Sequence, residues 1–148
     1  MTENTRIALE SYVNARRALL DAMLADHRGG TSANDIARAA AAAWSRPVTL
    51  DYLSAWDRHA RARDALAAAG LDGYVDVRTT GDTAGPRRVR LQIACDPADM
   101  EPDTWRALPD RIVAALMGAG VGWTSPGAGA ASLGAVLGEV DDVELFDL

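Results

Sequence analysis

The chain has 148 residues, of which 49% are hydrophobic, and a formal net charge of −6. This composition supplies enough apolar side chains for one domain or two small ones. The longest apolar runs are short alanine runs, which excludes a membrane-spanning helix of about 20 residues. A single cysteine excludes an intrachain disulfide and a cysteine-based metal cluster, and two histidines argue against a multi-histidine metal site. The N-terminal residues lack the basic and then apolar layout of a secretory signal. We therefore expect a soluble, cytoplasmic protein that uses no metal and no cofactor.

Charge is distributed unevenly between the two halves of the chain. All basic residues are arginines, which together with the abundant alanine and glycine indicates a GC-rich genome. Residues 1–70 contain nine arginines and eight acidic residues, whereas residues 71–148 contain six arginines and thirteen acidic residues. The whole chain is thus not basic, and any contact with nucleic acid must come from a local patch. The N-terminal half is the place where such a patch is expected.

Three helices are predicted in the N-terminal half. In the first, apolar residues such as Leu9, Val13 and Leu20 recur at helical spacing, and a glycine pair ends the segment. Ser32 is a suitable N-cap for the second helix, and Pro47 suits the first position of the third. The predicted ranges are 5–27, 33–44 and 47–69.

The C-terminal half changes to the alternating pattern of strands. Residues 74–95 predict a β-hairpin around a turn-rich loop. A helix is predicted over 103–117, where Pro109 implies either a kink or a division into two pieces. Residues 121–124 predict a short strand, which would complete a β-α-β unit if it ran parallel to 87–95. The Gly/Ala-rich stretch 127–138 fits either a loop or a short helix, and the acidic tail 139–148 predicts an edge strand.

The expected fold class is therefore α+β. An N-terminal three-helix helix-turn-helix region, 1–70, is followed by a wing-like β-hairpin, a helix and short strands over 71–148. The two regions could also pack as one compact unit.

The start of the third predicted helix carries the most informative motif. An Ile36-Ala37 pair early in one helix is followed by the small Ala40 and then by Ser45-Arg46-Pro47, which opens the next helix. Residues 35–53 resemble the helix-turn-helix of bacterial DNA-binding regulators, with one departure: residues 41–44 replace the usual short turn. The resemblance implies that the second helix enters the major groove with its N-terminal residues at base edges. Carried onto this chain, those positions are Ser45, Arg46, Thr49 and Tyr52.

Further arginines could extend this surface. A helix-turn-helix followed by a hairpin resembles a winged helix, which implies that the hairpin contacts phosphates or the minor groove. The candidate residues are Arg58 and Arg61 on the third helix and Arg87 and Arg88 by the tip of the hairpin. Alternatively, Arg46 only caps a turn, and the hairpin arginines form cross-strand ion pairs with Asp76.

The function expected from these patterns is sequence-specific binding of double-stranded DNA by a transcriptional or plasmid/phage-type regulator. A homodimer is expected as well, because two copies double the number of contacts from a weak basic patch and can bind a DNA site with two-fold symmetry. The first helix and the acidic C-terminal portion are the candidate dimer surfaces. The alternative is a non-enzymatic module that binds a protein partner through its acidic C-terminal half.

Catalysis is the weakest interpretation. Cys95 lies at the end of an alternating apolar segment, so we expect it to be a small buried side chain. His27 lies at the end of a predicted helix, and His59 is expected to be solvated. The remaining enzyme hypothesis uses the carboxylates Asp96, Asp99, Glu101 and Asp103, which cluster around two prolines. A solvated acidic loop in which Asp103 caps the following helix explains that cluster better than a metal site does, so we expect no enzyme activity.

Overall fold

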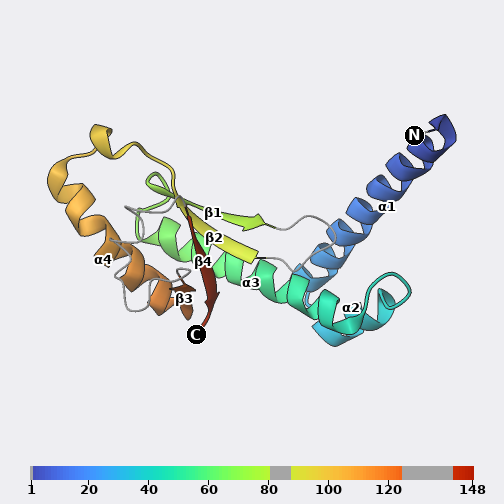
Figure 1. Ribbon diagram of the computed structural model, residues 1–148. Helices are drawn as coiled ribbons and strands as arrows, with labels where there is room; N and C mark the ends of the chain where they lie inside the picture. The colour runs from blue at the N-terminus through green and yellow to red at the C-terminus, as the bar shows by residue number, and fades with distance from the viewer. Residues whose placement is uncertain (1, 81–87, 125–141) are drawn as a thin grey trace. The chain divides into compact units, whose positions relative to one another are not determined.

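The computed structural model describes residues 2–80, 88–124 and 142–148 (Figure 1). Within them, helices are combined with a four-stranded antiparallel sheet, so the expected α+β class is confirmed. The predicted tip of the hairpin and the Gly/Ala-rich stretch 127–138 lie outside the described residues. The elements are α1 (Glu3–Arg28), α2 (Ala33–Ala39), α3 (Arg46–Ala68), β1 (Val75–Thr80), β2 (Arg88–Ile93), η1 (Pro97–Asp99), α4 (Pro102–Gly118), β3 (Val121–Thr124) and β4 (Asp142–Asp147).

The described residues divide into two compact units. The first contains residues 2–53, and the second contains residues 54–80, 88–124 and 142–148. The boundary lies inside α3 and not at Gly70, because α3 gives its first two turns to the core of the first unit and the rest to the sheet.

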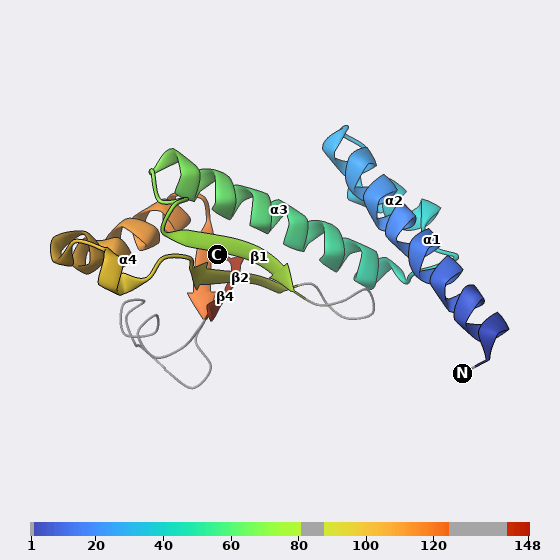
Figure 2. The ribbon, with the colours of Figure 1, turned by 90° about the horizontal axis from the view of Figure 1, so that it is seen from above.

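The first unit is built from α1, α2 and the start of α3. Its core consists of side chains that recur at helical spacing on the three segments, and α2 lies beside α1 (Figure 2). Gly30, after the end of α1, has a φ of 98°, which glycine adopts without strain. The buried side chains are Leu20, Met23, Ile36, Ala37, Ala40, Thr49, Tyr52 and Leu53.

The prediction that α2 extends to Trp44 was wrong. The backbone leaves the helix at Ala40, and the next N–H groups form tight turns, with Ala43 donating to Ala40 O at 2.9 Å. Residues 41–43 are exposed, so no packing energy holds them in a helix despite the high propensity of alanine.

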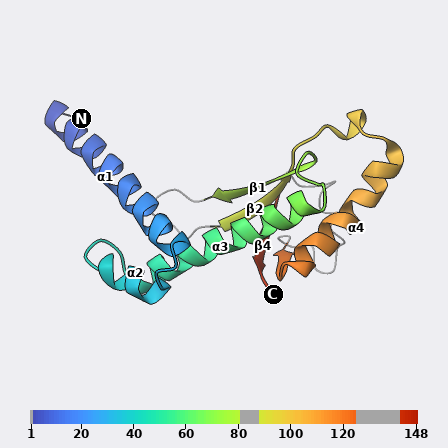
Figure 3. The ribbon, with the colours of Figure 1, turned by 180° about the vertical axis from the view of Figure 1, so that it is seen from behind.

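The second unit is a four-stranded sheet in the order β1-β2-β4-β3, in which every neighbouring pair is antiparallel. Alternate residues of each strand point to one buried face, such as Val89 and Leu91 on β2 and Val143 and Leu145 on β4. The later part of α3 and α4 cover that same face (Figure 3). The predicted hairpin is therefore confirmed, with Val75 opposite Ile93 and Thr80 opposite Arg88.

The C-terminal strand corrects one expectation about the sheet and adds a feature to another. The tail was predicted to form an edge strand, but β4 lies in the interior between β2 and β3. β3 runs parallel to β2, as a β-α-β unit requires, yet β4 separates the two strands. Val143 and Leu145 are fully buried on the face of the sheet that α3 and α4 cover.

α4 continues through Pro109 without a break. Leu108, Ile112 and Leu116 on its inner face are all fully buried against the sheet, and this packing compensates for the hydrogen bond that proline cannot donate. In the described part of the chain, no helix combines the length and the apolar character that crossing a membrane requires.

Candidate nucleic-acid interface

Two arginines converge on an open recess in the first unit. The recess has a volume of about 320 Å³ and is lined by Asn34, Arg38 and Arg46. Nη2 of Arg46 donates to Oδ1 of Asn34 at 2.6 Å, which fixes the guanidinium at the start of α3. Both arginines are exposed. The recess thus presents two cations from two helices to solvent.

The local backbone explains why this recess lies at a helix start. Pro47 follows Arg46 in the first turn of α3, where its missing N–H has no cost. Ser45 O accepts the first helical hydrogen bond, from Thr49 N at 3.1 Å. The first turn of α3 has no acidic side chain, so the positive end of the helix dipole is not neutralised there. Such a helix start favours an anionic ligand.

Neighbouring carboxylates limit the positive charge of this surface. Arg38 is 82% exposed but pairs with Asp35 at 3.1 Å. Asp51 is exposed one turn further along α3. The surface is thus a small cationic patch of Arg38 and Arg46, bounded by acidic residues.

Sequence reasoning placed Thr49 and Tyr52 on the DNA-reading surface, and the structure contradicts this. Thr49 is fully buried and Tyr52 is 6% exposed. Their spacing with Leu53 places all three on the face of α3 that forms the core of the first unit. Tyr52 packs edge-on against Trp44, with ring centroids 5.9 Å apart. Of the predicted residues in this segment, Ser45 and Arg46 are exposed.

Thr49→Val should stabilise the protein. The Thr49 Oγ1 is buried and has no hydrogen-bond partner among the described residues. Replacing this hydroxyl with a methyl group of similar size should raise the free energy of unfolding by about 1 kcal/mol. Urea unfolding measures the change, and Thr31→Val, at an exposed position, is the matched control that should give no comparable gain. A loss of stability in Thr49→Val would show that the hydroxyl is satisfied.

Arg58 and Arg61 fasten the C-terminal strand and are not free to bind DNA. Both guanidinium groups pair with the carboxylate of Asp147, and the Arg58 side chain is only 15% exposed. Arg58 also donates to Leu145 O at 3.4 Å, and Arg61 donates to Ala119 O at 3.0 Å. The sequence could not reveal this role, because the partners lie 58 to 89 residues away.

Asp147→Asn should make stability less dependent on acid pH. Burial raises the pKa of the Asp147 carboxyl, but the hydrogen bonds and the positive charges of Arg61 and Arg58 together outweigh it, and the pKa lies below its usual value. The ionised carboxylate therefore stabilises the fold above the unfolded pKa of about 3.9, and this contribution is lost as pH falls through the lowered folded pKa.

Urea unfolding at neutral pH and near pH 3 tests this dependence. Asp147→Asn should be less stable than the wild type at neutral pH, and the difference should shrink in acid. Asp103→Asn is the matched control, because Asp103 is 95% exposed and makes a looser pair with Arg106 at 3.5 Å. An equal loss at both pH values would show that the charge of Asp147 does not matter.

The hairpin arginines are placed only in part. Arg87 lies outside the described residues. Arg88 is 52% exposed on the outer face of the sheet, 3.7 Å from Glu144 of β4. The predicted cross-strand pairing with Asp76 is wrong, since Asp76 stands opposite Gln92 and pairs with Arg78 on its own strand. β2 also pairs with β4, so this hairpin is part of a wider sheet.

Asn34 and Arg38 are site residues that sequence reasoning missed. They lie four residues apart on α2, hence on one face of that helix. That spacing was a usable signal, but the proximity of Arg46 depends on how the turn 40–45 folds.

The other chemically active side chains have structural roles. His59 was expected to be solvated, but it is half-buried, and its Nε2 donates to Val77 O at 2.9 Å. Cys95 is half-buried, with its Sγ 3.3 Å from the Met100 Sδ. Asp96 Oδ1 accepts from Ala98 N at 2.9 Å and thereby supports η1. Among the described residues, no cluster of His, Cys, Asp and Glu is placed to hold a metal ion.

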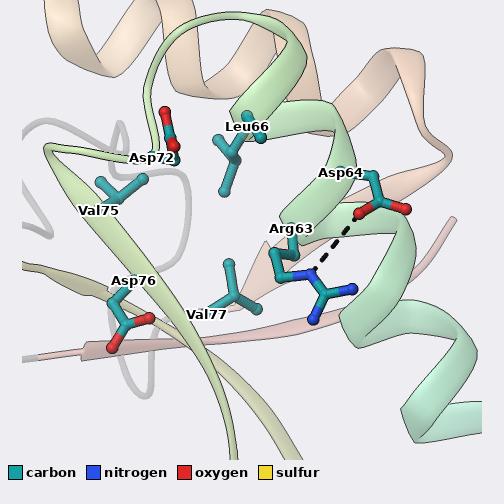
Figure 4. A pocket seen from close by; sticks show the side chains of 8 residues that line it. Arg63, Asp64, Leu66, Asp72, Val75, Asp76 and Val77 are labelled. Carbon is teal, nitrogen blue, oxygen red and sulfur yellow. Dashed lines mark ion pairs between the residues drawn. The ribbon is translucent and has the colours of Figure 1, made fainter.

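A second recess, of about 310 Å³, lies between α3 and β1 (Figure 4). Its charged lining includes Asp64, Asp72 and Asp76, and its one arginine, Arg63, lies 3.6 Å from Asp64. This recess is therefore not suited to an anionic ligand such as phosphate.

Comparisons with protein-family models, with curated proteins and with solved structures found no match to this chain.

Proposed function

We propose that the first unit binds double-stranded DNA, as a transcriptional or plasmid/phage-type regulator. α2, the turn 40–45 and the start of α3 act as the helix-turn-helix element. The observation that carries this proposal is the convergence of Arg38 and Arg46 on one open recess at the N-terminal end of α3. A helix start with exposed arginines can meet both base edges and phosphates.

The residues of the recess have distinct roles in this proposal. Arg46 uses one N–H to bind Asn34, so its remaining donors can reach the acceptors of a guanine edge in the major groove. Arg38 contacts a backbone phosphate, for which its pairing with Asp35 must open. Ser45, exposed beside Arg46, binds a neighbouring phosphate or base edge.

Because the cationic patch of Arg38 and Arg46 is small, we propose that the protein binds DNA as a homodimer. One copy presents two arginines, and the adjacent Asp35 and Asp51 repel phosphate. Two copies on a two-fold DNA site double the number of favourable contacts.

The salt dependence of DNA binding tests the proposal. Fluorescence anisotropy of pooled double-stranded fragments should show binding at about 50 mM salt that weakens strongly at about 200 mM, because phosphate contacts release counterions. Single-stranded fragments of the same sequences are the control. No binding at the lower salt concentration would refute DNA as the ligand.

The second candidate is a protein-binding module. It is favoured by the apolar side chains exposed at the end of the second unit, Phe146 at 37% and Leu148 at 69%, beside the acidic residues of β4. An interface with an apolar core would respond weakly to salt, which distinguishes it from phosphate contacts. Retention of a partner on an immobilised full-length chain at high salt would support this candidate.

A further inference from the structure

α1 carries an apolar seam of which only half is covered. Its apolar members Leu9, Val13, Leu20 and Met23 lie along one side of the helix. Arg16 occupies the position between Val13 and Leu20 and stacks over the Trp44 ring at 5.1 Å. Leu20 and Met23 are buried within the first unit, whereas Leu9 is 48% and Val13 is 39% exposed. The N-terminal half of the seam thus faces solvent.

Six charged residues flank this seam on one side. With about 100° of rotation per residue, the same flank of α1 carries Glu3, Arg6, Glu10, Arg17, Asp21 and Arg28. Their charges alternate in sign along the helix, beginning with the negative Glu3. Within the helix Arg6 pairs with Glu3 and, at 2.6 Å, with Glu10, while Arg17 and Asp21 are exposed and form no ion pair with any described residue.

We propose that the exposed seam of α1 pairs with α1 of a second copy of this chain in antiparallel orientation. In an antiparallel pair of identical helices, a given flank of one helix faces the same flank of the other helix. If the two helices cross between Val13 and Asn14, Arg6 faces Asp21 of the partner subunit, and Glu10 faces Arg17 of the partner subunit. The alternation is therefore self-complementary, and each of these ion pairs occurs twice.

A parallel pair does not use this complementarity. It would bring the charged flank of one helix against the opposite flank of the other, which contains Ala8 and Ala15. The exposed Val13 lies at the centre of the antiparallel arrangement and loses its contact with water there. Charge pattern and apolar exposure thus favour the same orientation.

This pairing specifies the dimer included in the proposed function and depends on that proposal for its purpose. Two joined copies would present two α2–α3 surfaces to one DNA site. The pairing itself does not require DNA, so it is measured without DNA. If the wild type is monomeric but still binds DNA, the pairing is overturned and the proposed function is retained. If the wild type dimerises but binds no DNA, the pairing is retained and the proposed function is overturned.

Sedimentation equilibrium of the full chain tests the apolar half of the pairing. The wild type should dimerise with micromolar affinity, and Val13→Asp should be monomeric because the pair would bury two carboxylates. Ile7→Asp is the matched control: Ile7 is 50% exposed but lies on the opposite side of α1, so this variant should dimerise like the wild type. Circular dichroism checks that both variants keep their helices. A wild type that is monomeric up to about 100 µM, or a Val13→Asp variant that still dimerises, would overturn the pairing.

A charge exchange tests the orientation. Arg17→Glu should weaken dimerisation by about tenfold, because it replaces two attractive pairs with two repulsive ones. Adding Glu10→Arg to that variant should recover most of the loss, since the two exchanged positions then again face each other with opposite charges across the pair. Failure of the double variant to recover would overturn the antiparallel register even if Val13→Asp abolishes the dimer.

Discussion

Arg46→Ala should weaken binding of double-stranded DNA by about 5- to 150-fold, corresponding to about 1–3 kcal/mol. Arg46 is the exposed cation at the start of α3, and Asn34 holds its guanidinium in place at 2.6 Å. Because only side-chain contacts at an exposed site are removed, the free energy of unfolding should change by less than about 0.5 kcal/mol. Anisotropy titrations at two salt concentrations, beside a urea unfolding curve, measure both effects.

Two variants define what the loss means. Arg106→Ala removes an arginine that is 77% exposed on α4 and has no part in the recess, so it should bind DNA almost like the wild type. Arg46→Lys keeps the charge but not the planar fork, so it should retain nonspecific binding and lose discrimination between sites. Equal losses in Arg46→Ala and Arg106→Ala would mean that only overall charge matters, which would argue against a reading role for Arg46.

Ile112→Ala should lower the free energy of unfolding by about 2–5 kcal/mol. Ile112 is fully buried on the inner face of α4, among Leu108, Leu116 and the inward-facing residues of the sheet. Removing its side chain takes apolar contacts from the centre of the second unit and leaves a cavity there. Thermal and urea unfolding measure the loss, and a cost below about 1 kcal/mol would show that this core is not formed as described.

The same substitution in the first unit is a matched comparison. Ile36 is 3% exposed on α2, the helix that carries Asn34 and Arg38. Ile36→Ala should therefore both destabilise the protein and weaken DNA binding, because it loosens the support of the recess. Ile112→Ala should leave the affinity for DNA unchanged at temperatures at which it is still folded. Weaker DNA binding by Ile112→Ala than by Ile36→Ala would place the interface in the second unit.

Elements fixed by local interactions could be predicted from the sequence. The spacing of apolar residues predicted α1, α3 and α4 to within about two residues at each end, because caps, glycines and Pro47 act on neighbouring backbone groups. The alternation of apolar and polar residues in 74–95 predicted both strands of the hairpin. Their pairing could also be predicted, because a short loop joins the two strands and favours pairing between neighbours in the sequence. α2 was predicted too long, since propensity alone did not reveal that residues 41–43 stay exposed.

The position of each side chain relative to distant parts of the chain could be decided only by the tertiary structure. The sequence pointed to Arg46 as an exposed residue at a helix start, but not to the Asn34 amide that holds it. It also marked Thr49 and Arg58 as DNA contacts, whereas packing buries the first and Asp147 engages the second. The order of the strands along the chain likewise did not indicate that β4 lies inside the sheet, between β2 and β3. Burial and long-range pairing depend on which surfaces meet when the chain folds, and residue spacing along one segment does not contain that information.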